Sequence, residues 1–257
     1  MTDDAAREAG VLGVIPARIG STRLPRKPLL PIAGRTLIEW VWRRASTVDG
    51  FDELVVAADD PEIVAAVEAF GGRAVLTRRD HASGTDRIAE VVEREDFADF
   101  GSIVNLQGDE PFLPPSAARA VVQGVQSGWD IGTAAVPIYN TDEWEDPSVV
   151  KVVRDDQGGA LYFSRAPIPY DGTGRGAERL RLLRHVGIYA FTRGSLDRAT
   201  ALPPHPLEER EGLEQLRWLA AGLRIGVAVV DGGGPGIDTE EDLVRAEQLL
   251  GGREGSI

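Results

Sequence analysis

Four basic side chains lie close together in the segment PARIGSTRLPRK (residues 16–27), namely Arg18, Arg23, Arg26 and Lys27. Arginine guanidinium groups bind phosphate oxygens in pairs, and a lysine ammonium group adds a compact positive charge. The segment fits neither the Walker A pattern nor the glycine pattern of dinucleotide-binding proteins. It therefore indicates a loop that binds a triphosphate, with a solvated basic loop as the alternative.

Two acidic turns have residues suited to a divalent cation. Asp109 lies in QGDEP (residues 107–111), directly after an apolar run, and Asp238 lies in GIDTEEDL (residues 236–243), after a glycine-rich stretch. Magnesium in nucleotide sites is held by one or two carboxylates together with water and substrate phosphates. The alternatives are a surface acidic turn at Asp109 and a helix-capping arrangement in the second motif.

Three further motifs carry polar side chains, and each has a purely structural alternative. The small residues of DHASGTDR (residues 80–87) would let a flat base approach the backbone, but Ser83 or Thr85 would also cap a helix. His185 and Tyr189 in RHVGIY would share one face of a strand, which is also what a half-buried strand requires. Glu214 and Gln215 in LEQLR lie on an expected helix, where a solvated face is the alternative.

The elements that position these residues follow from the apolar pattern. In the first half of the chain, expected strands alternate with expected helices, the strands at 11–17, 53–59, 73–77 and 102–109 and the helices at 36–45, 61–70 and 85–97. This alternation predicts an α/β fold with a mostly parallel, doubly wound sheet and right-handed crossovers. Ligands bind at the carboxyl ends of strands in such sheets. We therefore expect the basic loop, residues 77–86 and QGDEP to converge on one edge.

The second half of the chain is less regular. It has expected strands at 131–138, 148–155, 159–169, 185–192 and 224–231, and expected helices at 213–222 and 239–250, the latter capped by Thr239. A glycine- and charge-rich segment, residues 170–183, predicts a mobile loop, and the tail at 251–257 is expected to fray. No repeat or linker is visible, so we expect a single domain, residues 1–257.

Composition excludes several classes of protein. The chain has 41 acidic against 28 basic residues, a net charge of −13, which argues against a general nucleic-acid or anionic-membrane binder. There is no cysteine and there are three histidines, which excludes disulfides and makes a histidine-rich metal site unexpected. No apolar run is long enough to span a membrane, and the N-terminus lacks the features of a secretory signal. We expect a soluble cytoplasmic protein.

Taken in order, the motifs resemble one enzyme family. PARIGSTRLPRKPL, HASGTDR, VNLQGDEP, VKVV, ALYFSRAPIP, RHVGIYAF, LEQLR and GIDTEEDL occur as in the 3-deoxy-D-manno-octulosonate (Kdo) cytidylyltransferases, from about Val11 to about Leu249. The first motif and QGDEP are shared more loosely with other sugar nucleotidyltransferases, whereas ALYFSRAPIP, RHVGIY and LEQLR are more specific to this family.

The resemblance implies a Rossmann-like nucleotidyltransferase fold with a small dimerisation subdomain, in which about residues 133–195 contain the dimerisation and sugar-binding region. It implies a homodimer that uses Mg²⁺ and converts CTP and Kdo into CMP-Kdo and pyrophosphate, for lipopolysaccharide or capsule synthesis. The partners would be these small molecules, with no nucleic acid and no membrane.

The resemblance also implies roles for individual residues. The triphosphate would be bound by Arg18, Arg23 and Lys27, and the cytidine by Arg78, Ser83 and Gln107. Magnesium would be bound by Asp109 and Asp238, which together with Arg18 and Lys27 form the expected catalytic set. The sugar acid would be bound by Arg165, His185, Tyr189, Glu214 and Gln215.

The sequence departs from the family pattern at three positions. Arg26 stands where glycine is common, Ala58 where threonine is usual, and Asp86 where glutamate is usual. Arg26 therefore suggests a different loop conformation. Two alternatives remain open: a cytidylyltransferase for a related sugar acid, either an 8-amino Kdo analogue or a sialic acid, or a non-catalytic nucleotide-binding regulator. The intact Lys27, Asp109 and Asp238 count against the regulator, because such a protein would not need them.

Overall fold

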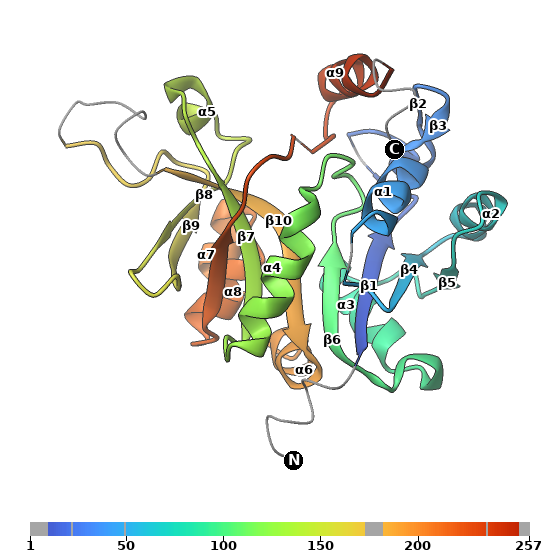
Figure 1. The fold of residues 1–257 in the computed structure, drawn as a ribbon, viewed down its shortest axis with the longest axis horizontal. Coiled ribbons are helices and arrows are strands. Elements are labelled where there is room, and N and C mark those ends of the chain that lie inside the picture. The colour runs from blue at the N-terminus through green and yellow to red at the C-terminus, as the bar shows by residue number, and fades with distance from the viewer. Residues whose placement is uncertain (1–9, 22, 49, 173–181, 235, 252–257) are drawn as a thin grey trace. The chain divides into compact units, whose positions relative to one another are not determined.

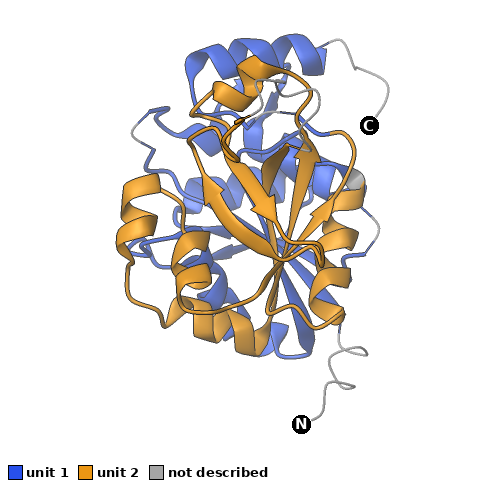
Figure 2. Ribbon diagram, turned by 90° about the vertical axis from the view of Figure 1, so that its left-hand side faces the viewer, with its two compact units in different colours: residues 1–115, 233–257 blue, residues 116–232 orange. Residues whose placement is uncertain are grey.

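The structure is a computed structural model that describes residues 10–21, 23–48, 50–172, 182–234 and 236–251. Its contacts divide the chain into two compact units (Figure 2): unit 1 is residues 1–115 with 233–257, and unit 2 is residues 116–232. The sequence predicted a single domain, and the region predicted for dimerisation and sugar binding, about 133–195, falls within unit 2.

Unit 1 contains a four-stranded parallel sheet in the order β6-β1-β4-β5 (Figure 1). Its strands are β1 (Gly10–Ala17), β4 (Glu53–Ala58), β5 (Ala74–Leu76) and β6 (Phe100–Leu106). Leu12, Val14 and Ile15 of the central strand β1 are fully buried. Near-continuous apolar strands of this kind are typical of parallel sheets covered on both faces. The α/β class with a mostly parallel sheet, predicted from the alternation, is confirmed.

The helices of unit 1 begin at capping residues that the sequence supplies. They are α1 (Leu37–Ser46), α2 (Pro61–Ala69), α3 (Gly84–Val92) and α9 (Glu240–Gly251), with 3-10 turns at Lys27–Leu29 (η1) and Glu95–Phe97 (η2) and a hairpin of β2 (Pro31–Ile32) and β3 (Arg35–Thr36). Thr36 accepts a hydrogen bond from the Glu39 N–H, and Thr239 caps α9 as predicted, accepting from the Asp242 N–H. The helix predicted over 85–97 is shorter, because Phe97 turns into the core within η2.

Unit 2 combines parallel and antiparallel strands. They are β7 (Ile131–Pro137), β8 (Lys151–Arg154), β9 (Ala160–Ser164), β10 (Leu183–Thr192) and β11 (Ile225–Val229). β11 pairs with β7 in parallel, whereas β10 pairs antiparallel with β7 and β8, and β8 with β9. All five strands were predicted. Residues 173–181 of the predicted loop and residues 252–257 of the predicted frayed tail lie outside the described residues.

Unit 2 also contains helices that the sequence analysis missed. They are α4 (Pro115–Gln126), α5 (Thr141–Glu145), α6 (Arg193–Thr200) and α7 (Pro206–Glu211); only α8 (Gln215–Ala220) was predicted. α4 approaches β7 so closely that a Cβ atom on Gly132 would lie 2.1 Å from the Val121 carbonyl oxygen. Glycine at this position therefore allows the helix to lie directly against the strand. Among the helices described in either unit, none has both the length and the apolar character needed to cross a bilayer.

Candidate functional site

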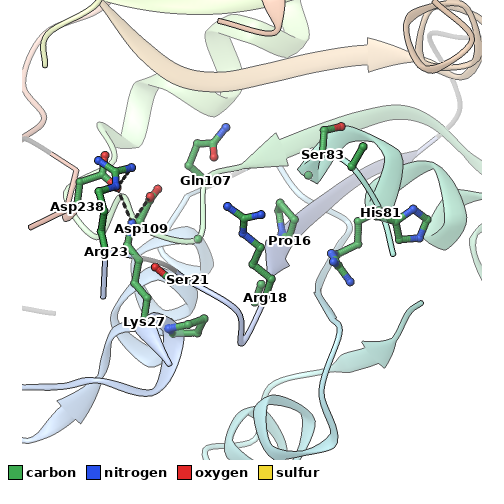
Figure 3. A pocket seen from close by; sticks show the side chains of 16 residues that line it. Pro16, Arg18, Ser21, Arg23, Lys27, His81, Ser83, Gln107, Asp109 and Asp238 are labelled. Atoms are coloured by element: carbon green, nitrogen blue, oxygen red, sulfur yellow. Dashed lines mark hydrogen bonds and ion pairs between the residues drawn. The ribbon is translucent and has the colours of Figure 1, made fainter. Parts of the chain in front are cut away.

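Unit 1 has a pocket of about 300 Å³ beyond the carboxyl ends of β1 and β6 (Figure 3). Its lining comes from the loop after β1, the start of α3, the turn after β6 and the segment before α9, and includes Arg18, Ser21, Arg23, Lys27, His81, Ser83, Arg87, Gln107, Asp109 and Asp238. The predicted convergence of the three loops on one edge is confirmed. A volume of this size is within the range of small-molecule sites.

A cluster of opposite charges forms one end of the pocket (Figure 3). The Lys27 ammonium nitrogen lies 2.6 Å from Asp109 Oδ2 and 2.9 Å from Asp238 Oδ1, and Arg23 lies 3.0 Å from the same Asp238 oxygen. The Lys27 side chain is only 13% exposed. The Ile237 N–H donates to the Asp109 carbonyl at 2.9 Å, which holds the two acidic turns together. Two carboxylates from distant parts of the chain therefore converge on one cation.

The basic loop reaches this cluster through an unusual backbone conformation at Arg26. Its φ is 58° and its ψ 31°, in the left-handed region that glycine adopts most readily. The loop thus has a conformation suited to the glycine common in the resembling family, although the residue is arginine. The Arg26 guanidinium group pairs with Glu62 in the first turn of α2, and this contact raises the pKa of Arg26. Lys27 follows immediately and begins η1.

The opposite end of the pocket is built around the start of α3. Ser83 caps the helix in a reciprocal arrangement with Asp86, whose carboxylate accepts from the Ser83 N–H at 3.1 Å. The prediction that Ser83 caps a helix is therefore confirmed. The aspartate side chain of Asp86 is long enough to complete the capping box. His81 Nε2 lies 2.5 Å from Glu90 Oε2. Burial raises the pKa of Glu90, but hydrogen bonds from His81 and the Arg78 N–H outweigh it, so the pKa is lowered.

A buried arginine, which the sequence analysis did not find, is among the residues that line the pocket. Arg87 is 3% exposed and donates to Thr77 Oγ1 at 2.6 Å and to the Arg78 carbonyl at 2.9 Å. Burial lowers its pKa, and Asp59, 3.7 Å away, partly compensates. Asp59 also accepts from the Ile19 N–H in the basic loop at 2.8 Å. The sequence signal that could have identified Arg87 is its position, as a charged residue, on the apolar face of a predicted helix.

The polar residues predicted for the sugar acid all lie in unit 2. His185 Nε2 lies 2.9 Å from Thr133 Oγ1, and the His185 and Tyr189 rings are 5.3 Å apart. Tyr189 also packs edge-on against Trp218 of α8, the helix that begins at Gln215. Gln215 is 4% exposed. The structure thus brings His185 and Tyr189 together beside α8.

The two remaining sugar candidates have protein partners of their own. Glu214 accepts from Arg217 at 2.9 Å, and the Arg165 Nε–H donates to the Glu211 carbonyl at 2.9 Å, at the end of α7. The convergence of all five residues on one cavity facing Asp109 stays a prediction.

A family model described as cytidylyltransferase matches residues 12–225. The 3-deoxy-manno-octulosonate cytidylyltransferase of Gemmatimonas aurantiaca is 50% identical over 239 residues, which cover 92% of each chain. The relative of the same name from Methylococcus capsulatus is 48% identical over 249 residues, covering 93% of this chain and 96% of the relative. The chain belongs to the 3-deoxy-manno-octulosonate cytidylyltransferase family.

A solved structure is also similar to this family member. It is CMP:2-keto-3-deoxy-manno-octonic acid synthetase complexed with CTP, with a TM-score of 0.85 and 44% sequence identity, covering 94% of this chain and 98% of the other. The family predicted from the motifs, and the nucleotidyltransferase fold predicted with it, are confirmed.

The pocket of this cytidylyltransferase collects most of the residues predicted for CTP and magnesium. Its lining includes Arg18, Arg23, Lys27, Ser83, Gln107, Asp109 and Asp238. Arg78 is not among the described lining residues: its side chain is 70% exposed and lies 3.5 Å from Glu90 and 3.8 Å from Asp80. The roles of all these residues stay predictions.

His185 is electrically neutral in the folded cytidylyltransferase. Burial, assisted by the positive charge of Arg184, lowers its pKa from 6.5 to about 3. With Thr133 as its hydrogen-bond partner, the ring is suited to contact a hydroxyl group rather than a carboxylate.

We predict that His185 makes the unfolding free energy depend on pH. Below about pH 6.5 the unfolded chain binds a proton at His185, whereas the folded chain does not until about pH 3, so stability falls as the pH is lowered through this window. Each proton of difference corresponds to about 1.4 kcal/mol per pH unit. His185→Gln should reduce the slope between about pH 6 and 4 by up to that amount, measured by urea unfolding. Equal slopes in both proteins would contradict the prediction.

Proposed function

We propose that this chain transfers CMP from CTP to Kdo, releasing pyrophosphate and forming CMP-Kdo. The observation that carries the proposal is the close match, over nearly the whole of both chains, to a solved synthetase complexed with CTP. The Gemmatimonas and Methylococcus relatives are named for the same reaction. The pocket of unit 1 adds a physical basis, since it combines basic side chains with two carboxylates at the expected edge of the sheet.

The proposed reaction needs no nucleophile from the protein. The anomeric hydroxyl of Kdo attacks the α-phosphorus of CTP in line, a new oxygen–phosphorus bond forms, and the bond to the pyrophosphate oxygen breaks. The task of the protein is then to position the reactants and to stabilise charge that develops on the leaving group. Arg18, Arg23 and Lys27, all lining the pocket, would hold the triphosphate.

Lys27 has the most specific role in this proposal. It is the least exposed basic side chain of the cluster, so its charge is less screened by water than that of Arg23, which is 66% exposed. Its ammonium group would stabilise the leaving pyrophosphate. Ser83 and Gln107, farther along the pocket (Figure 3), would contact the cytidine, with Arg78 as a further candidate outside the lining.

The carboxylate pair fits the proposed magnesium cofactor. Asp109 and Asp238 already share one cation, and oxygen ligands of this kind are those that Mg²⁺ takes in nucleotide sites, where substrate phosphates complete its coordination. When bound, the ion would supply charge neutralisation for the phosphates and lower the pKa of the attacking hydroxyl.

We further propose that the sugar acid is bound by Arg165, His185, Tyr189, Glu214 and Gln215, and that the enzyme acts as a homodimer in the cytoplasm, in lipopolysaccharide or capsule synthesis. Three large exposed apolar side chains within the predicted dimerisation region support a contact surface there: Tyr139, Leu161 and Tyr170 are 73%, 60% and 89% exposed.

The reaction is tested by mixing the protein with CTP, Mg²⁺ and Kdo and measuring both pyrophosphate and CMP-Kdo. We expect both products with Kdo, and neither after chelation of the metal. A panel with an 8-amino Kdo analogue and a sialic acid tests the alternative sugar acids. Binding of CTP without any product from the whole panel would instead indicate a nucleotide-binding regulator.

We predict that Lys27→Ala lowers kcat by about a hundredfold or more while changing the CTP KM much less. Several basic groups share the bound triphosphate, whereas the charge on departing pyrophosphate needs a cation at one place. Arg43→Ala, which removes a basic residue paired with Glu39 on α1, is the matched control and should leave both constants near wild type. An unchanged kcat with a raised CTP KM would show that Lys27 only binds.

We predict that Asp109→Asn and Asp238→Asn each lower turnover by about a hundredfold or more, and that the double variant is little worse than either. The reason is that both carboxylates would serve one cation. Asp96→Asn, a neutralisation at an exposed aspartate of unit 1, controls for general charge loss. Additive losses in the double variant, or near-wild-type turnover of a single one at saturating Mg²⁺, would refute the shared site.

A further inference from the structure

A fully buried lysine lies in unit 2. Lys151 opens strand β8 with 0% of its surface exposed. Its ammonium group donates to three main-chain carbonyls, those of Asp146 at 2.8 Å, Val149 at 2.6 Å and Arg165 at 2.6 Å. An ammonium group has three N–H donors, so every donor is used. A neutral amine has two, and would leave one buried carbonyl opposite its lone pair.

One of the three carbonyls belongs to Arg165 itself. The other two, from Asp146 and Val149, belong to the turn at residues 146–149. Within this turn the Pro147 carbonyl accepts a hydrogen bond from Arg165 Nη1 at 3.1 Å. Lys151 therefore fixes the backbone of Arg165 and also the turn on which its guanidinium group rests.

Glu211 holds Arg165 from the other side. Its carboxylate accepts from the Arg165 N–H at 2.9 Å, and its main-chain carbonyl accepts from Arg165 Nε at 2.9 Å. The guanidinium group is thus fixed at Nε and Nη1, while its Nη2 group has no hydrogen-bond acceptor among the described residues. An arginine held in this way keeps donors available for an anion in a fixed orientation.

We infer that Lys151 is a positioning residue for Arg165 and so sets the affinity for the carboxylate of the sugar acid. The inference rests on the proposed function, in which Arg165 meets that carboxylate. Burial lowers the pKa of Lys151, opposed by the nearby carboxylate of Asp146, and the three carbonyls favour the charged form. All three ammonium N–H groups of Lys151 donate to main-chain carbonyls, so in the proposed function Arg165 is the cation that meets the substrate carboxylate.

The test removes the three donors while keeping most of the side-chain volume. Lys151→Met should raise the Kdo KM by about tenfold to a hundredfold, the range expected for a lost hydrogen bond to a charged group, and leave the CTP KM near wild type. In an Arg165→Ala background, Lys151→Met should add little further, because both changes act through one guanidinium group. Val152→Ala, a cavity-forming change at the next buried residue of β8, is the control for general destabilisation and should leave both KM values unchanged.

A merely structural role would give different results. KM values for CTP and Kdo that rise together, or an effect of Lys151→Met that persists in full without Arg165, would overturn the inference. If Lys151→Met does not fold, Lys151→Gln, which keeps two donors, takes its place in the same comparisons.

A second measurement needs no substrate and separates this inference from the proposed function. The Arg165 Nε–H resonance, assigned by its absence in Arg165→Ala, should exchange with solvent at least about tenfold faster in Lys151→Met than in wild type or Val152→Ala. Unchanged exchange would overturn the positioning role. If wild-type protein forms no CMP-Kdo, the proposed function fails, and the exchange result still decides whether Lys151 positions Arg165.

Discussion

The geometry of the unit 1 pocket depends on the shared contact of one ammonium group with two carboxylates. Asp109 and Asp238 would repel one another if they were brought together alone, and the chain as a whole carries a net charge of −13. Lys27 makes their proximity favourable because it lies within hydrogen-bond distance of both and is mostly shielded from water. The left-handed turn at Arg26 and the Ile237–Asp109 hydrogen bond place the three groups.

This arrangement also explains why a polyphosphate would suit the pocket. Arg23 and Lys27 carry two positive charges and the two aspartates carry two negative ones, so the cluster is close to neutral by itself. A triphosphate bound with a divalent cation would give each group a new partner, because its phosphate oxygens would suit the basic side chains and the carboxylates would hold the cation. The cluster can therefore exchange its internal ion pairs for contacts with ligand without leaving a buried charge uncompensated, which would otherwise be costly.

The sequence predicted those parts of the structure that have a strong local signal. The strands of both units have continuous apolar runs, and α1, α2 and α9 begin at recognisable caps, so their positions were predicted closely. Because strand ends of a parallel sheet share one edge, the meeting of Lys27 with Asp109 followed from topology. α4 was missed although PSAARAVVQGVQ separates its apolar and polar residues onto two faces nearly as clearly as α1 does.

Contacts between side chains distant in sequence were harder to predict. Arg87 was not singled out, because its role depends on Thr77 and Asp59, which no local pattern connects to it. Arg78 was assigned on the motif alone, and its exposed position reflects the contact of its main chain with Glu90. The candidates in unit 2 came entirely from the family resemblance, since their strand and helix patterns equally describe an ordinary core.

Lys151 and His185 of unit 2 differ in their protonation, and their partners explain why. His185 meets one hydroxyl and lies near the positive Arg184, so nothing compensates for its loss of hydration and it remains neutral. Lys151 meets three carbonyl dipoles, which take up all the donors of its charged form. Neither group therefore offers a free positive charge to a ligand. For a substrate that has one carboxylate and several hydroxyls, this division is useful. In the proposed function Arg165 would attract the carboxylate, while the neutral ring of His185 would contact a hydroxyl without drawing the carboxylate into a second orientation.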